Sequence, residues 1–263
     1  LAAHGAEEGP LPLQGAVQAA GGAGATSSAS SPSPSSPLRA AAAAAAARVL
    51  VPVDSPFDAA GSWTLDDAVG KAFLRRLDAL WPRLPVPRGE ATQVAKRTSQ
   101  RLFFCDAEGW IVDEVRRAVE AAGLGRAAVV SPWMRFLRYK LANKTLKAHV
   151  DYQWLPGYAN DEQQGYTPQG LETTHSFLLY LTDCPHGGET LLLDRLPPSR
   201  KPPPRRGEPP VPAPPEEPEP VVLAAVAPRR GRLLLFPHHC VHAGAPVAHL
   251  PKVLLRGDVQ IVA

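Results

Sequence analysis

The sequence predicts a mainly β domain with flanking helices, built as an antiparallel sandwich or jelly roll. Short segments rich in leucine, valine and aromatic residues follow one another, separated by turn signals such as Asn143 and Gly187-Gly188. Only two segments show the four-residue spacing of apolar residues that is typical of an amphipathic helix. Two tracts, residues 1–48 and 197–220, contain few large apolar residues and cannot join a core. The remaining residues 49–263 suit one domain.

Two amphipathic patterns predict the helices that flank the sheet. The first ends at Pro82, because proline stops a helix. The second begins after Asp106, a suitable N-cap, and ends at Gly123. Nothing in either pattern resembles chemistry, so we expect both helices to brace a sheet. Their apolar positions are Leu65, Val69, Phe73, Leu77 and Trp81 in the first, and Ile111, Val115, Val119 and Ala122 in the second.

The strand predictions rest on alternating or continuous apolar runs. Between two of the strands, the polar, Gly-rich residues 156–173 form a loop that could cover the mouth of an active site. The Pro-rich residues 197–220 interrupt the sheet as a disordered insertion, either a tolerated hairpin extension or a Pro-rich ligand for a partner. The segments expected as strands are 49–53, 102–104, 133–141, 146–152, 175–181, 187–193 with its turn, 221–226, 232–236 and 252–262.

The N-terminal residues 1–48 are mainly alanine, glycine, serine and proline. Ordering them would cost entropy without burying apolar surface, so we expect a disordered tail. The tail has few acids and many serines and resembles an organelle transit peptide. Its alanine run is too short to cross a bilayer. We therefore expect a soluble protein with no membrane contact, organellar if the tail is the remnant of such a peptide.

Charge and cysteine content exclude further classes. The formal net charge is only +3, and the basic residues are scattered among acids, so nucleic acid is not expected as a partner. The three cysteines, Cys105, Cys184 and Cys240, are an odd number without paired spacing. A disulfide framework is therefore not expected, and a reducing compartment is favoured.

His149 and Asp151 form the most informative pair in the chain. Side chains two positions apart in a strand leave from the same face, roughly 7 Å apart at the backbone, so one cation can lie between them. With His242 as a third ligand, two histidines and one carboxylate match the arrangement of non-haem Fe(II) oxygenases. Two alternatives stay open at this point. His239 could replace His242, or Cys184-x-His186 and Cys240-x-His242 could form a closed zinc site.

Several further motifs follow one another along the second half of the chain. They are Arg138-Tyr139, His149-x-Asp151, Tyr180-Leu181-Thr182, Gly187-Gly188-Glu189-Thr190, Pro228-x-x-Gly231-x-Leu233-x-x-Phe236-Pro237, His242-x-Gly244-x-Pro246-Val247 and Lys252-x-x-x-Arg256-x-Asp258. Their order and spacing resemble those of the Fe(II)- and 2-oxoglutarate-dependent dioxygenases, specifically the prolyl 4-hydroxylase type of catalytic domain. The resemblance covers residues 131–263 and implies a double-stranded β-helix, or jelly roll, as the core. The chain departs from the family pattern at Leu141-Ala142-Asn143, Ala243 and Gly257, none of which is a ligand.

The resemblance implies roles for individual residues. His149, Asp151 and His242 would bind the catalytic Fe(II). Lys252 would bind the far carboxylate of 2-oxoglutarate, and Arg256, on the same strand face, is the alternative because a guanidinium fork suits a carboxylate. The remaining cofactor-binding candidates are Tyr180, as a hydrogen-bond donor to that carboxylate, and Tyr139, as a lining residue of the same pocket.

The resemblance also implies the reaction. We expect O2- and 2-oxoglutarate-dependent hydroxylation of an unactivated C–H bond, with succinate and CO2 as co-products and ascorbate as the reductant. A prolyl residue of a peptide or protein is the favoured substrate. Two alternatives stay open: an oxygenase of the same superfamily acting on a small molecule or a nucleic-acid base, or an inactive jelly-roll binding module.

Overall fold

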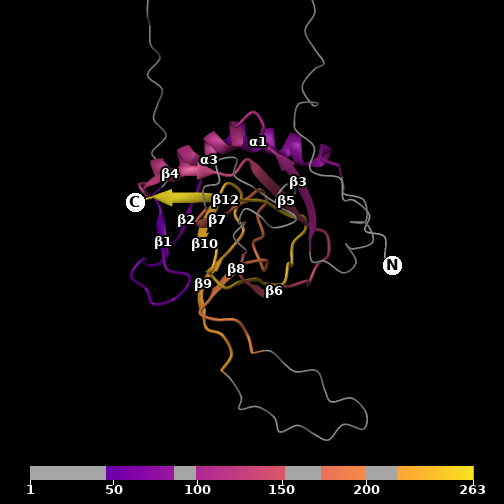
Figure 1. Ribbon diagram of the computed structural model, residues 1–263. Helices are drawn as coiled ribbons and strands as arrows, with labels where there is room; N and C mark the ends of the chain where they lie inside the picture. The colour runs from indigo at the N-terminus through magenta and orange to yellow at the C-terminus, as the bar shows by residue number, and fades with distance from the viewer. Residues whose placement is uncertain (1–45, 86–98, 152–172, 199–217, 263) are drawn as a thin grey trace, which may run out of the picture.

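The computed structural model describes residues 46–85, 99–151, 173–198 and 218–262 (Figure 1). The expected tail at residues 1–48, the loop at 156–173 and the Pro-rich insertion at 197–220 lie almost wholly outside these described residues. Within them, no helix is long and apolar enough to cross a membrane.

Two antiparallel β-sheets face each other and form the jelly roll that the sequence predicts. The large sheet has the strand order β1-β2-β10-β7-β12-β5-β3, with β4 paired to β12, and the small sheet has the order β6-β11-β8-β9. Strands far apart in sequence are therefore neighbours. The strands are β1 (Arg48–Val51), β2 (Ser62–Leu65), β3 (Gln100–Cys105), β4 (Arg126–Val130), β5 (Trp133–Tyr139), β6 (Leu146–His149), β7 (His175–Tyr180), β8 (Thr190–Leu193), β9 (Val222–Val226), β10 (Leu233–Pro237), β11 (His242–Gly244) and β12 (Lys252–Val262).

Helices α1 (Lys71–Leu80) and α3 (Trp110–Ala121) cover the outer face of the large sheet, and a short 3-10 helix, η2 (Trp81–Arg83), follows α1 (Figure 1). Leu77 of α1 and Val115 of α3 are fully buried against apolar side chains of the strands. On the sheet side, Phe104 of β3 stacks on Phe136 of β5 with ring centroids 5.1 Å apart. The helices thus brace the sheet, as expected.

A second core fills the space between the two sheets. Because side chains alternate along a strand, Leu137 and Tyr139 of β5 point into this space, while Met134 and Phe136 point toward the helices. The same alternation directs Lys252, Leu254 and Arg256 of β12 inward. The inner core residues are Val51, Ala59, Leu137, Tyr139, Leu178, Tyr180, Leu192, Val226, Leu234, Phe236, Cys240, Val247 and Leu254.

The first helix begins later than the spacing of apolar residues predicts. Leu65 belongs to strand β2, Val69 precedes the helix, and Trp81 follows it in η2. All three are nevertheless apolar residues of the outer core, the apolar cluster between the helices and the large sheet. The four-residue spacing therefore extends beyond the helix. The predicted helix boundary at Leu65 is therefore wrong.

Asp106 caps α3, as the sequence predicts, although it lies four residues before Trp110, the first residue of the helix. Its carboxylate accepts hydrogen bonds from the backbone N–H groups of Ile111 and Val112 at 2.7 and 2.9 Å. Gly109 is the N-cap by backbone conformation, with φ of 74°, a left-handed value that glycine adopts without strain. The side chain thus satisfies two of the donors that a helix N-terminus leaves free.

Candidate metal and 2-oxoglutarate site

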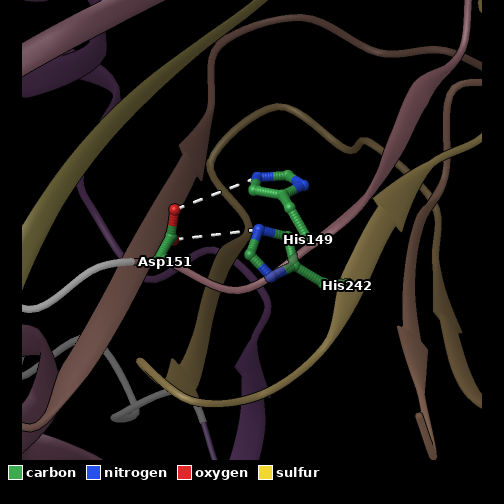
Figure 2. A group of neighbouring side chains, drawn as sticks. All are labelled: His149, Asp151 and His242. Atoms are coloured by element: carbon green, nitrogen blue, oxygen red, sulfur yellow. Dashed lines mark ion pairs between the residues drawn. The ribbon is translucent and has the colours of Figure 1, made fainter. Parts of the chain in front are cut away.

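His149 and His242 are brought together by the pairing of β6 with β11. They are direct partners across these antiparallel strands, and their ring centroids lie 4.2 Å apart. Figure 2 shows the two imidazoles side by side, with Asp151 facing both. His242 is buried and His149 is partly exposed. A pair of residues separated by 93 positions in the chain is thus fixed by strand register.

Both imidazoles are held in one tautomer by backbone carbonyls. The Nδ1 atom of His149 lies 2.8 Å from the carbonyl oxygen of Lys147, and the Nδ1 atom of His242 lies 3.0 Å from that of Cys240. A carbonyl oxygen only accepts hydrogen bonds, so each Nδ1 carries the hydrogen and donates it. Each Nε2 is left with a free lone pair, the form in which histidine binds a metal. Burial lowers the pKa of His242 to about 4, so it is neutral at physiological pH.

Asp151 follows β6 rather than lying within it. Its backbone N–H donates to the carbonyl oxygen of His238 at 3.1 Å, which fixes the chain beyond the strand end. Its carboxylate oxygens lie 4.0 Å from Nε2 of His149 and 3.8 Å from Nε2 of His242. One potential ligand atom from each of the three residues lies within 4.8 Å of the others.

Among the described residues, these three form the only group of histidine, cysteine or acidic side chains with the geometry of a metal site. The zinc alternative built on Cys184 and Cys240 is therefore not formed there. Both cysteines are buried free thiols, and burial raises the pKa of each. A thiol that stays protonated is a poor metal ligand.

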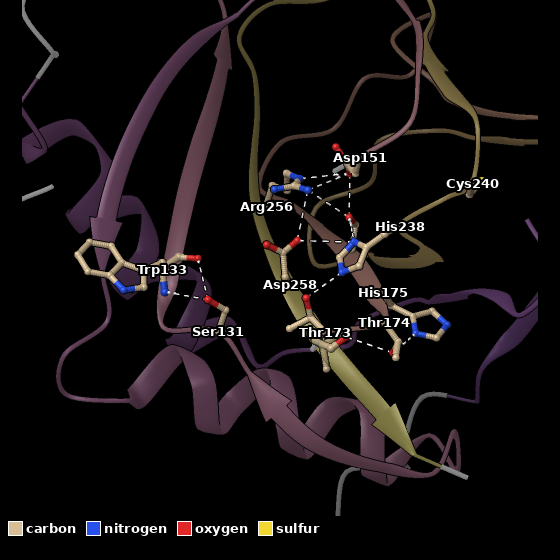
Figure 3. A network of polar contacts seen from close by, with 12 residues as sticks. Ser131, Trp133, Asp151, Thr173, Thr174, His175, His238, Cys240, Arg256 and Asp258 are labelled. Carbon is tan, nitrogen blue, oxygen red and sulfur yellow. Dashed lines mark hydrogen bonds and ion pairs between the residues drawn. The ribbon is translucent and has the colours of Figure 1, made fainter. Parts of the chain in front are cut away.

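The carboxylate of Asp151 is kept ionised by its neighbours (Figure 3). Burial raises its pKa, but the opposing effects of Arg256, His242 and Arg135 and a hydrogen bond from Ser176 outweigh burial and hold the pKa well below its usual range. Ser176 Oγ donates to Asp151 Oδ2 at 2.8 Å, and Nη2 of Arg256 lies 3.1 Å from the same oxygen. The site therefore offers a metal one negative charge beside the Nε2 atoms of the two imidazoles.

Arg256 lies between two carboxylates rather than facing an open space. Its Nη2 atom is 3.1 Å from Asp151 and 3.2 Å from Oδ1 of Asp258 (Figure 3). Burial lowers the pKa of Arg256, but Asp258 and Asp151 outweigh this effect and raise it overall. The guanidinium is thus already paired, and its position suits orienting Asp151.

His238 is a buried part of the same network. Because the Ser176 hydroxyl donates to Asp151, it accepts from Nδ1 of His238 at 3.0 Å, and Nε2 of His238 lies 2.9 Å from the Thr173 hydroxyl. The sequence predicts His238 and His239 as loop residues near the mouth. Both lie in the turn after β10, where His239 is exposed and His238 is only 6% exposed.

A pocket opens beside the three candidate ligands, and Lys252 lines its wall. Lys252 is 1% exposed, its Nζ donates to the carbonyl oxygen of Gly188 at 2.7 Å, and it lies 4.5 Å from the ring centroid of Tyr139. Burial lowers the pKa of Lys252 to about 8. The Tyr180 hydroxyl contacts Thr190 Oγ1 at 2.7 Å, and Thr190 lines the pocket.

Sequence reasoning gave no site role to four residues that shape this site, although two of them, Thr190 and Asp258, stand in the motifs above. The four are Arg135, Ser176, Thr190 and Asp258. The signal that could have found three of them is strand alternation, which places residues two positions apart on the same face of a strand. Ser176 lies two positions before inward-facing Leu178, and Asp258 lies two positions after Arg256. Arg135 stands in the same relation to Leu137 and also lines the pocket.

Residues 134–257 match the sequence model of the 2OG-Fe(II) oxygenase superfamily. Similar solved structures include the viral collagen prolyl hydroxylase vCPH from Paramecium Bursaria Chlorella virus-1 in its 2OG complex, at 15% identity over 80% of this chain and 100% of that one, with a TM-score of 0.46. A Pseudomonas putida prolyl-4-hydroxylase matches at 15% identity over 77% of this chain and 94% of its own, with a TM-score of 0.42. HygX from Streptomyces hygroscopicus, with nickel, 2-oxoglutarate and hygromycin B bound, matches at 14% identity over 77% of this chain and 83% of its own, with a TM-score of 0.46. No curated protein matches the chain.

Proposed function

We propose a specific reaction and a specific set of residues for this 2-oxoglutarate-dependent oxygenase domain, whose residues 134–257 match the sequence model of the 2OG-Fe(II) oxygenase superfamily. We propose that it hydroxylates an unactivated C–H bond, with a prolyl residue of a peptide or protein as the substrate. Residues 49–263 form the proposed catalytic domain.

Fe(II) is proposed to bind His149, Asp151 and His242. The observation that carries this assignment is the pair of Nδ1 atoms directed at backbone carbonyls, which leaves both Nε2 lone pairs facing the Asp151 carboxylate. Two histidines and one carboxylate on one face of a metal leave its other positions open. When bound, the iron supplies the activation of O2 with 2-oxoglutarate as co-substrate.

Lys252 is proposed to bind the far carboxylate of 2-oxoglutarate. It is a buried cation in the pocket wall, and its one hydrogen-bond partner among the described residues is a neutral carbonyl oxygen rather than an acid. Arg256, the alternative, is already paired with Asp151 and Asp258, and we assign it to positioning Asp151. Tyr180 is proposed to donate a hydrogen bond to the same carboxylate, and its hydroxyl lies 2.7 Å from Thr190 Oγ1 at the pocket wall.

Asp151 also bears on the outcome of the reaction. A carboxylate ligand occupies the position that a halide would need, so hydroxylation is favoured over halogenation. Ser176 and Arg256 hold this carboxylate in its ionised form, which keeps it available to a metal.

Succinate release by the full chain tests this function. The reaction contains Fe(II), 2-oxoglutarate and ascorbate, which we propose as the reductant. Peptides are supplied in matched pairs that differ at one position, which is proline in one peptide and alanine in the other. We expect succinate release with the proline peptide and not with the alanine peptide, and we expect the proline peptide to gain one oxygen atom. Succinate release that is coupled to neither peptide but to a small molecule or a nucleic-acid base would contradict the prolyl assignment and leave the oxygenase chemistry standing.

A further inference from the structure

Arg135 is a pocket residue whose guanidinium finds no acceptor in the described part of the chain. No hydrogen bond or ion pair among the residues that the structure describes involves it, and its Nε atom is buried without a hydrogen-bond partner. By contrast, Lys252 donates to the carbonyl oxygen of Gly188, and Arg256 is paired with Asp151. A buried donor without an acceptor is costly, and more so when it carries a charge. The position calls for an anion that none of the described residues supplies.

The neighbours of Arg135 increase this need. Arg135 and Arg256 are direct partners across β5 and β12, and like charges in that relation repel. Arg256 forms ion pairs with Asp151 and Asp258 (Figure 3). Both carboxylates also attract Arg135, but no ion pair among the described residues joins either of them to it. Arg101 of β3, opposite Leu137, adds a third guanidinium to the same pocket. Burial, and then Arg256, lower the pKa of Arg135 to about 9, so it is still charged at neutral pH.

The position of Arg135 along the strands separates it from the proposed 2-oxoglutarate clamp. Lys252 pairs with Tyr139, four residues from the row of Arg256 and Arg135, which corresponds to roughly 13 Å along the sheet. Arg256 touches Asp151, so this row lies level with the three candidate metal ligands. An anion on Arg135 would therefore lie beside the metal and away from Lys252.

We propose that Arg135, with Arg101 next to it, binds an oxyanion of the substrate, so that the enzyme acts on a C–H bond close to a carboxylate or phosphate group. A guanidinium fork binds either group through two parallel hydrogen bonds. The proposal rests on the proposed function, because it takes the pocket to be the active site. The proposal restricts the substrates to those that carry a carboxylate or phosphate group close to the reacting C–H bond.

Binding of inorganic phosphate tests the proposal without turnover. The full chain is loaded with Mn(II) and saturating 2-oxoglutarate in the absence of O2, and the relaxation of the phosphorus nucleus of added phosphate is measured, because bound phosphate close to Mn(II) relaxes faster. We expect a saturable enhancement in the unmodified protein and binding about tenfold or more weaker in Arg135→Gln. The matched control is Arg138→Gln. Arg138 also has a buried Nε without a partner, but it stacks over Trp81, does not line the pocket, and should leave phosphate binding unchanged.

Three results would overturn the proposal. These are the absence of saturable enhancement, equal enhancement in Arg135→Gln, as expected for phosphate bound directly to the metal, and equal loss in both variants. A fourth outcome reassigns the oxyanion: if Arg135→Gln weakens 2-oxoglutarate and phosphate does not bind, Arg135 serves the co-substrate and the proposal is wrong. Binding of Mn(II) and 2-oxoglutarate is measured in the same samples. If Mn(II) and 2-oxoglutarate bind and phosphate does not, only the inference about the substrate fails. If neither Mn(II) nor 2-oxoglutarate binds, the result contradicts the proposed function.

Discussion

Replacing Lys252 with methionine should weaken 2-oxoglutarate binding more than any other change in the pocket wall. Methionine keeps an unbranched side chain against Tyr139 and removes only the charged end. Lys252 is 1% exposed, so in the variant the far carboxylate of bound 2-oxoglutarate would be left buried without a counter-charge. Losing one partner of a buried charge pair costs about 2 to 5 kcal/mol, which corresponds to a rise in Kd of roughly thirtyfold to several thousandfold.

The assay is an anaerobic titration of the Fe(II)-loaded full chain with 2-oxoglutarate, followed by the visible charge-transfer absorption of the complex. Arg256→Gln is titrated in parallel at saturating Fe(II), and we expect its Kd for 2-oxoglutarate to stay close to that of the unmodified protein. An unchanged Kd in Lys252→Met together with a raised Kd in Arg256→Gln would refute the assignment and make Arg256 the clamp. Thermal unfolding of both variants checks that each is folded.

Further predictions concern pH, metal affinity and packing. Because the pKa of Lys252 is about 8 in the empty pocket and only the protonated amine attracts a carboxylate, the Kd for 2-oxoglutarate should rise about tenfold per pH unit above pH 8. A flat profile would contradict this. Arg256→Gln should weaken Mn(II) binding about 10- to 100-fold in a competition titration, because Asp151 loses its orienting partner, and unchanged affinity would exclude that role. A Cβ at Gly257 would lie 2.4 Å from Cζ of Phe177, so Gly257→Ala should lower the free energy of unfolding by about 1 to 3 kcal/mol in urea denaturation, and adding Phe177→Leu should recover part of it. Asp106→Ala should cost about 1 kcal/mol in the same assay, and no loss would mean that the two helix N–H groups find water instead.

The parts of the fold that strand alternation encodes locally could be predicted from the sequence. Strand β12 was predicted with both of its ends at Lys252 and Val262, because its eleven residues are apolar or inward-facing throughout. By contrast, β2, β4 and the three-residue β11 were missed, since their short runs carry no period. The start of α1 was placed too early because Leu65 and Val69 are outer-core residues that happen to continue the helical spacing.

The site was predictable where its residues lie on one strand and not where they meet across the fold. The His149-x-Asp151 spacing and the distance from His242 to Lys252 can be read directly from the chain. The partners of Arg256 cannot, because Asp151 lies 105 positions away and reaches it only because the two sheets face each other. The same holds for His238, whose burial depends on Thr173 and Ser176 from β7 and the segment before it.

Anaerobic titration of the full chain with Fe(II) in the presence of 2-oxoglutarate tests the three-residue iron site most directly. We expect one equivalent of Fe(II) to saturate the charge-transfer absorption, and His149→Ala and His242→Ala, still folded by circular dichroism, to show none at the same concentrations. A full absorption change in folded His242→Ala, or its absence in the unmodified protein, would contradict the site.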